Sequence, residues 1–100
     1  MTVSFHPAAQ QEYSESVDYY EEREPGLGLD FSAEVASAID RILAHPLAWP
    51  FIDEGIRRAL LRRYPYGVLY AIAGDSVFIL AVMHLHRSPG YWQSRTDPEQ

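Results

Sequence analysis

Four arginines in segment 56–63, which reads IRRALLRR, could support phosphate or carboxylate chemistry. If this segment is a strand, Arg58 and Arg62 lie on one face and Arg57 and Arg63 on the other, because side chains alternate along a strand. One face must meet the core, so at most one pair can line a site for an anion. The alternative is a solvated strand whose arginine stems cover apolar surface.

A second group of reactive side chains comprises His84, His86 and Arg87. Two histidines separated by one residue on a strand could ligate a metal ion. Zinc sites need a third protein ligand, however, and the remaining candidates are distant acids, so we predict no metal. Either imidazole could act as a general acid or base, because histidine titrates near neutral pH. A partly buried histidine at the end of a strand is the alternative.

Tyr91 and Trp92 follow the Ser-Pro-Gly turn at 88–90 and lie near Arg87 and Arg95 in the sequence. Aromatic rings beside arginines can stack on a base and hold its phosphate, as in sites for single-stranded RNA. They can equally pack this tail against a sheet, which we favour more for Trp92 than for Tyr91. The sequence contains no glycine-rich phosphate loop and no Ser-His-Asp order.

The composition is that of one small globular domain. The chain has 100 residues, of which 47% are hydrophobic and 22% charged, so we expect a single folded domain over residues 1–95 and a frayed tail at 96–100. Its longest apolar run, Val77 to Met83, is too short to cross a membrane. With no cysteine and no N-terminal apolar segment of the secretory type, the expected location is the cytoplasm.

The charge is distributed unevenly along the chain. Residues 1–54 hold eleven acidic residues and two arginines, a net charge of −9, whereas residues 55–100 hold three acidic residues and six arginines, a net charge of +3. Every cation is arginine, because the sequence contains no lysine. Such asymmetry predicts a dipolar surface and at least one charged partner.

Apolar periodicity predicts the elements that must position these side chains. A short alternating segment, 2–6, indicates a strand, and spacings of three and four predict helices over 8–24 and 29–44, separated by Pro25-Gly26. Tyr13 and Tyr20 then face the core, whereas Tyr19 is exposed and could mark an interface. After a loop at 46–55, three strands are expected at 56–63, 66–73 and 76–85, the last of them central and covered on both faces. The predicted fold class is α+β: an N-terminal strand and a two-helix antiparallel hairpin packed on a mostly antiparallel sheet.

Several of these segments together resemble the RelE/ParE toxin superfamily of type II toxin–antitoxin modules, often described as plasmid stabilization proteins. The resemblance rests on the helical hairpin, on RRYPY at 62–66, on VLYAI at 68–72, and on AVMHLHRSP at 81–89 followed by Tyr91-Trp92. It extends over about residues 3–95, with the elements in the same order.

The resemblance implies a cytoplasmic toxin that arrests growth and is neutralised by a cognate antitoxin protein. Members similar to RelE are ribosome-dependent mRNA endonucleases that use no metal or cofactor; here such a site would comprise Arg62, His84, Arg87 and Tyr91. Members similar to ParE poison DNA gyrase without catalysis. We favour the ParE-like mechanism, because Gly67 stands where the nucleases often carry a basic residue, and because a net charge of −6 repels the phosphate surface of a ribosome.

The resemblance also implies which partners this chain meets. We expect the antitoxin to pack on the helices and the sheet, and operator DNA to be bound only through the antitoxin; no membrane partner is expected. A non-toxic homologue that keeps only antitoxin binding is a third possibility. The residues predicted to bind the antitoxin or the target are Tyr13, Val17, Tyr19, Phe31, Val35, Arg58, Trp92 and Arg95.

Overall fold

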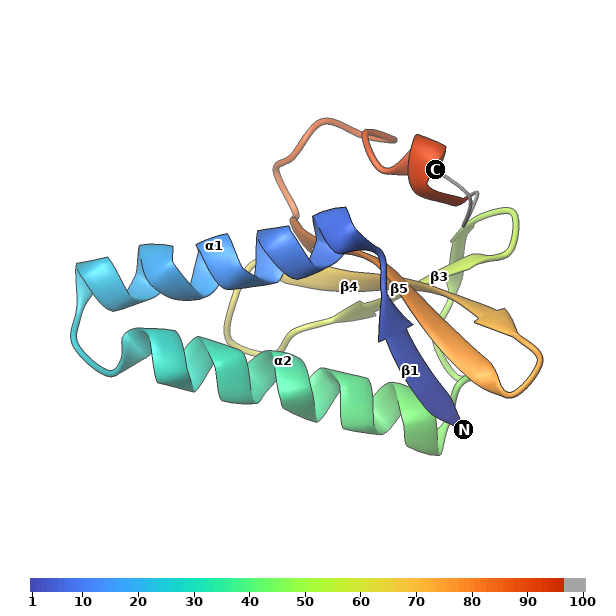
Figure 1. Ribbon diagram of the computed structural model, residues 1–100, viewed down its shortest axis with the longest axis horizontal. Coiled ribbons are helices and arrows are strands. Elements are labelled where there is room, and N and C mark those ends of the chain that lie inside the picture. Colours follow the sequence, from blue (N-terminus) through green and yellow to red (C-terminus); the bar gives the residue numbers. More distant parts are fainter. Residues whose placement is uncertain (97–100) are drawn as a thin grey trace.

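The computed structural model describes residues 1–96. It consists of one five-stranded sheet with both helices on the same face (Figure 1). The elements are β1 (Thr2–Phe5), α1 (Pro7–Arg23), α2 (Leu27–Ala44), β2 (Phe51–Asp53), β3 (Ile56–Leu60), β4 (Tyr66–Ala73), β5 (Ser76–His84) and a 3₁₀ helix, η1 (Gln93–Thr96). The strand order is β1-β5-β4-β3-β2, in which β1 is parallel to β5 and all other neighbours are antiparallel. The predicted α+β class with a mostly antiparallel sheet is confirmed.

The N-termini of both helices are capped by nearby side chains. The Nδ1 atom of His6 accepts a hydrogen bond from Ala8 N at 3.0 Å, and Pro7 is the first helical residue, where its missing N–H is not needed. Glu21, near the end of α1, accepts hydrogen bonds from the N–H groups of Gly26 and Gly28. This cap lets α2 begin at Leu27, two residues before the predicted start.

The main core lies between the helices and the sheet. Phe31, Val35, Ala38 and Ile42 of α2 have no exposed surface there, whereas α1 contributes only Ala9 as a buried residue. Tyr13, Val17 and Tyr20 of α1 are half-buried against the same cluster. Neither helix of the described residues is long and apolar enough to span a membrane.

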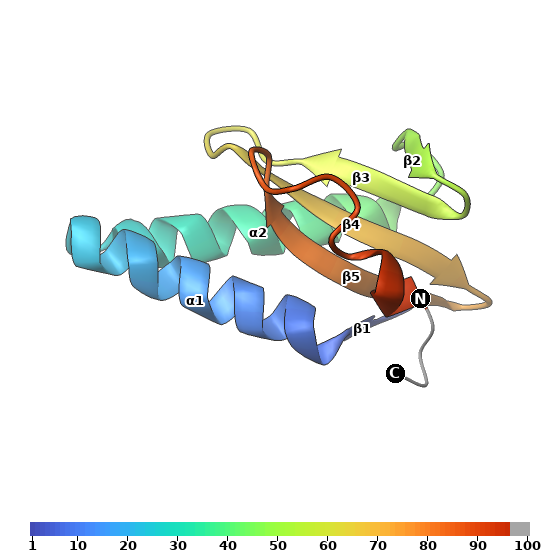
Figure 2. The same ribbon diagram turned by 90° about the horizontal axis from the view of Figure 1, so that it is seen from above.

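A second, smaller core covers the opposite face of the sheet, which we call the outer face. Trp92, 5% exposed, packs there on a cluster that includes Leu69, Leu80 and Met83. Figure 2 shows the C-terminal segment crossing this face over β4 and β5. The predictions that both faces of β5 are covered and that Trp92 packs on the sheet are confirmed. β5 was expected to be the central strand; it is an interior strand, second in the order, and β4 is the middle strand of the five.

The later strands also differ in places from the predicted ones. The strand predicted over 56–63 ends at Leu60, because the N–H groups of Arg62 and Arg63 leave the ladder and donate to Glu34 on α2. The strand predicted to end at 85 ends at His84. The predicted loop 46–55 contains the short edge strand β2. Of the predicted frayed tail, Thr96 belongs to η1 and residues 97–100 lie outside the described residues.

Candidate functional site

Three hydrogen-bond donors and a further cation converge on the carboxylate of Glu12, in the second turn of α1. Its Oε1 accepts from Val82 N at 3.2 Å and from Arg95 Nη1 at 2.8 Å, and its Oε2 accepts from the Tyr91 hydroxyl at 2.6 Å. Arg87 Nη1 lies 3.7 Å from Oε2. We call Glu12, Arg87, Tyr91 and Arg95 the Glu12 clasp, since it ties the C-terminal segment to α1.

The clasp forms where β5 loses its neighbour. The strand β1 ends at Phe5, opposite Ile79, so the rest of β5 has no strand beside it on that edge. There Glu12 accepts from Val82 N, and Arg95 donates to the carbonyl of Leu80 at 3.2 Å. Glu12 and Arg95 therefore satisfy two backbone groups of β5 that lie beyond the end of β1.

Within the clasp, the ring of Tyr91 makes cation–π contacts with two arginines. The guanidinium carbons of Arg87 and Arg95 lie 4.1 and 4.9 Å from its centroid. Burial of the phenol, together with its hydrogen bond to the charged Glu12, raises the pKa of Tyr91 well above its ordinary value. The hydroxyl is therefore a fixed donor to Glu12 at neutral pH.

A hollow of about 370 Å³ opens beside the clasp. It lies between α1 and the end of β5, and its lining includes Glu12, Glu15, His84, Arg87 and Arg95. A second hollow, of about 500 Å³, lies further along α1 and shares the Tyr66 and His84 side chains with the first. The two hollows thus follow one side of α1, with the Tyr66–His84 pair (ring centroids 5.1 Å apart) between them.

The structure brings together only part of the predicted nuclease set. Arg87 and Tyr91 are in the clasp and His84 lines the same hollow as Arg87. Arg62 does not line that hollow: it is exposed in the turn between β3 and β4, where its backbone N–H is bound to Glu34. The expectation that Arg62 shares a strand face with Arg58 is wrong, because β3 ends before it. His86 also lies beyond its strand, with its N–H donating to His84 Nδ1.

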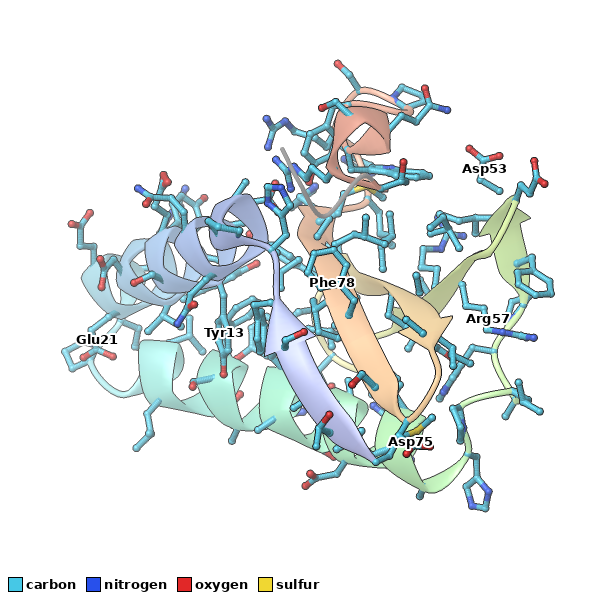
Figure 3. All side chains as sticks on the ribbon, turned by 45° about the vertical axis from the view of Figure 1, so that its right-hand side comes forward. Tyr13, Glu21, Asp53, Arg57, Asp75 and Phe78 are labelled. Carbon is cyan, nitrogen blue, oxygen red and sulfur yellow. The ribbon has the colours of Figure 1, made fainter. Side chains whose placement is uncertain are left out.

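The other arginines of the predicted strand have separate roles. Arg57 faces the helix side, donates to the carbonyls of Leu47 and Trp49 at 3.1 and 2.6 Å, and stacks on Phe51, so it holds the loop before β2 (Figure 3). Arg58 is the strand partner of Leu69, which belongs to the outer-face cluster. Paired residues point to the same side of a sheet, so the Arg58 side chain also lies on the outer face.

Arg63 belongs to a second group of charges, which fastens the β3–β4 turn to α2. Its guanidinium donates to Asp30 at 3.0 and 3.1 Å and to Glu34 at 3.0 Å, and Tyr64 donates to Asp30 at 2.5 Å. Hydrogen bonds from Tyr64 and then Arg63 lower the pKa of Asp30. Burial opposes ionisation of Glu34, but the backbone N–H groups of Arg63 and Arg62 and the Arg63 side chain outweigh it and lower the pKa of Glu34. Burial and the bond to Asp30 raise the pKa of Tyr64 to about 12.

The predicted partner-binding residues have different degrees of exposure. Tyr19 is 48% exposed, as expected, and lines the second hollow. Tyr13 and Val17 are half-buried and line a third hollow, between α1 and Ser32. Phe31 and Val35 have no exposed surface, so in this conformation no partner can contact them.

The two acids that organise these clusters, Glu12 and Glu34, were not among the predicted site residues, although the position of each in its helix is unusual. Glu12 lies three residues after Ala9, on the flank of the α1 core stripe. Glu34 lies within the α2 stripe, between Phe31 and Val35, and is 8% exposed. An acid inside an apolar stripe needs donors, and this requirement could have been recognised. Among residues 1–96 we find no group of three or more histidines, aspartates or glutamates arranged to hold a metal ion.

Comparisons with known proteins found a matching family model and a solved structure with a similar fold. The family model described as the ParE toxin of the type II toxin–antitoxin system, parDE, matches residues 3–89. A solved structure described as a chromosomal ParDE toxin–antitoxin system from P. aeruginosa is similar to this chain, with a TM-score of 0.74 and 19% identity, covering 86% of this chain and 97% of that chain. No match was found among curated proteins.

Proposed function

Because this chain belongs to the ParE toxin family of type II toxin–antitoxin systems, we propose that it arrests bacterial growth by binding DNA gyrase, without catalysis of its own, and that a cognate antitoxin neutralises it. Gyrase acts in the cytoplasm, so this is the compartment in which we expect the toxin to act. The ribosome-dependent mRNA endonuclease is the competing mechanism, and it makes a different demand on the side chains near the clasp.

The Glu12 clasp is the observation that favours a binding toxin over a nuclease. A metal-free nuclease needs free cations for the scissile phosphate and a group that can move a proton. Here Arg95 is paired with Glu12 at 2.8 Å, and Tyr91 donates a hydrogen bond to the same carboxylate. The raised pKa of Tyr91 keeps its phenol protonated at neutral pH, so it cannot accept a proton there. With Arg62 outside the hollow, the predicted catalytic set is incomplete, which supports a binding toxin.

Surface features of α1 support the proposal that an antitoxin binds along this helix. Two hollows follow one side of this helix, and the exposed Tyr19 lines one of them. An extended or helical segment of a partner protein could fill such adjacent hollows with successive side chains. Operator DNA would then be contacted through the antitoxin rather than by this acidic chain.

Pulse labelling after induction of the toxin without its antitoxin tests the proposed target. Synthesis of DNA and of protein is followed over the first minutes, with an uninduced culture as the control. We expect DNA synthesis to stop first. If protein synthesis stops first, the gyrase proposal is wrong and the endonuclease mechanism replaces it. If neither changes, the chain is not an active toxin in that host.

Variants of the hollow test the absence of catalysis. We expect His84→Ala and Tyr91→Phe to retain growth arrest, because a binding toxin needs neither group for proton transfer. The proteins' melting temperatures must be measured alongside, since Tyr91→Phe also removes a donor to Glu12. Loss of arrest in both variants at unchanged stability would support the nuclease instead.

A further inference from the structure

The C-terminal segment leaves part of the outer face uncovered, at the end of the sheet where β3 stops and β4 starts. Arg58 and Leu60 of β3 point outward there, and Gly67 of β4 is the partner of Leu60. Leu85 follows β5 on the same side. Leu60 and Leu85 are 44% and 38% exposed. We call Arg58, Leu60, Gly67 and Leu85 the Arg58 patch.

Gly67 makes room for Arg58 to lie across β4. A Cβ atom at position 67 would lie 2.9 Å from both Cγ and Cδ of Arg58, closer than carbon atoms can approach, and 3.6 Å from Leu85. Gly67 has no positive φ, so its backbone does not require glycine. A glycine inside a strand often marks close approach of another group, and here that group is the arginine stem. Gly67 has no basic side chain of its own, but the side chain of Arg58, from the neighbouring strand, lies over it.

The guanidinium of Arg58 is available to a partner. Within residues 1–96 it makes no ion pair, no hydrogen bond and no cation–π contact, whereas Arg57, Arg63, Arg87 and Arg95 are all engaged within the chain. Its stem is held against the sheet, so only its charged head remains to be ordered on binding.

The chemistry of the patch indicates the kind of partner. A cation between two exposed leucines is complementary to a carboxylate flanked by apolar side chains on another protein. Single-stranded RNA would instead require aromatic stacking surfaces and several cations in a row, and the patch contains only aliphatic groups and one arginine. The patch also lies on the face opposite the helices, away from the hollows that we assign to the antitoxin.

We propose that the Arg58 patch is the surface through which this toxin docks on an acidic, partly apolar segment of its protein target. This inference deepens the proposed function and rests on the target's being a protein. It assigns to Gly67 a specific role, which is to let Arg58 cross the strand.

The test uses the full chain with three variants of the patch. Arg58→Gln removes the charge, Leu60→Ser removes one apolar flank, and Gly67→Ala keeps the charge but displaces the arginine stem. Arg41→Gln and Leu29→Ser are matched controls on α2, on the other side of the molecule. Growth arrest is measured as the inducer level needed for half inhibition, and purified DNA gyrase is the probe for binding and for loss of supercoiling. Thermal melting confirms that each variant folds.

We expect each patch variant to need about tenfold more toxin, the change that 1.4 kcal/mol of lost binding produces, while both controls match the wild type. Patch variants that arrest growth as well as the wild type would overturn the inference and leave the gyrase proposal intact. If the wild type arrests growth without affecting gyrase, yet the patch variants fail to arrest, the gyrase proposal fails and the patch stands. If the variants lose affinity for an RNA oligonucleotide that the wild type binds, the protein partner is wrong.

Discussion

At the scale of single residues, two carboxylates on the helices hold segments that are distant in the sequence. Glu12 binds the C-terminal segment through Tyr91 and Arg95, and Glu34 binds the β3–β4 turn through Arg63. Each is almost buried, and burying an acid is unfavourable unless donors surround it. Both helices therefore do more than cover the sheet: they fix the two segments that carry the arginines.

Removing the charge of Glu12 should loosen the C-terminal segment. For Glu12→Gln we expect the free energy of unfolding to fall by about 2–3 kcal/mol, because charge-assisted bonds to Arg95 and Tyr91 are lost while Arg95 stays largely buried. Urea unfolding measures the difference. Glu15→Gln, an exposed acid that lines the same hollow, is the matched control and should change stability little. Equal effects of the two substitutions would show that the clasp contributes nothing specific.

At the scale of the elements, aromatic packing joins the β3–β4 turn to the helical hairpin. Tyr64 and Tyr66, the two tyrosines of the YPY segment, lie 5.1 and 4.9 Å from Phe31 between ring centroids, and Tyr20 lies 5.0 Å from Tyr64. The motif on which the family resemblance partly rested is thus a packing motif. It positions the turn and the start of β4, and with them the Arg58 patch.

The group around Glu34 predicts the behaviour of the protein in acid. The pKa values of Asp30 and Glu34 are lowered in the folded state, from ordinary values of 3.8 and 4.5. Their contribution to stability is therefore fully present above about pH 4.5 and is lost as the pH falls through the lower folded-state values. We expect the melting temperature to decline steeply below pH 4.5, and Glu34→Gln to make that decline shallower. An unchanged acid slope in the variant would contradict this assignment.

Gly28 sets the approach of the two helices. A Cβ atom there would lie 2.6 Å from the carbonyl oxygen of Val17 and 2.8 Å from Cβ of Glu21. Glycine to alanine in a helix ordinarily stabilises by up to about 1 kcal/mol, but here overpacking should reverse the sign and destabilise by about 1–3 kcal/mol. Chemical unfolding of Gly28→Ala checks this, with Ser37→Ala, at an exposed site on α2, as the control. A more stable Gly28→Ala would show that the helices can separate freely.

At the scale of the whole molecule, both faces of the sheet are packed against other segments, but to different extents. The helices cover one face, and the C-terminal segment covers part of the other through Trp92 (Figure 2). A truncation before Trp92 would expose Leu69, Leu80 and Met83 to water. Loss of toxicity in such a truncation would therefore report unfolding as readily as loss of a binding surface, which is why substitutions in the Arg58 patch are the sharper test.

Substitution of Trp92 tests how much the outer-face core contributes to the stability of the protein. For Trp92→Ala we expect a loss of about 3–5 kcal/mol, the range for a large aromatic removed from a core, together with a lower melting temperature. Trp92→Phe, which keeps most of the apolar area, should lose much less. If Trp92→Ala unfolds at the wild-type temperature, the outer-face core does not support the sheet.

The sequence alone was sufficient for the fold class, for both helices to within two residues, and for recognising β5 as a strand covered on both faces. These follow from local periodicity, which any stretch of chain carries in itself. The helical hairpin and the segments RRYPY, VLYAI and AVMHLHRSP, followed by Tyr91-Trp92, were sufficient for the family resemblance. The burial of Trp92 also followed, because a large ring beside a central apolar strand needs cover.

Only the tertiary structure decided which arginines are available. The sequence treated Arg57, Arg58, Arg62 and Arg63 as two equivalent pairs, but three of them have different surroundings. Arg63 binds Asp30 and Glu34 on α2, Arg57 binds carbonyls of the preceding loop, and Arg58 lies across Gly67 of the neighbouring strand. The end of β3 was missed for the same reason, since the acid that takes its next backbone donors lies on α2. Strand alternation is a local rule, whereas an ion pair forms wherever folding brings opposite charges together, so the tertiary structure was needed to separate Arg58 from the engaged Arg57 and Arg63.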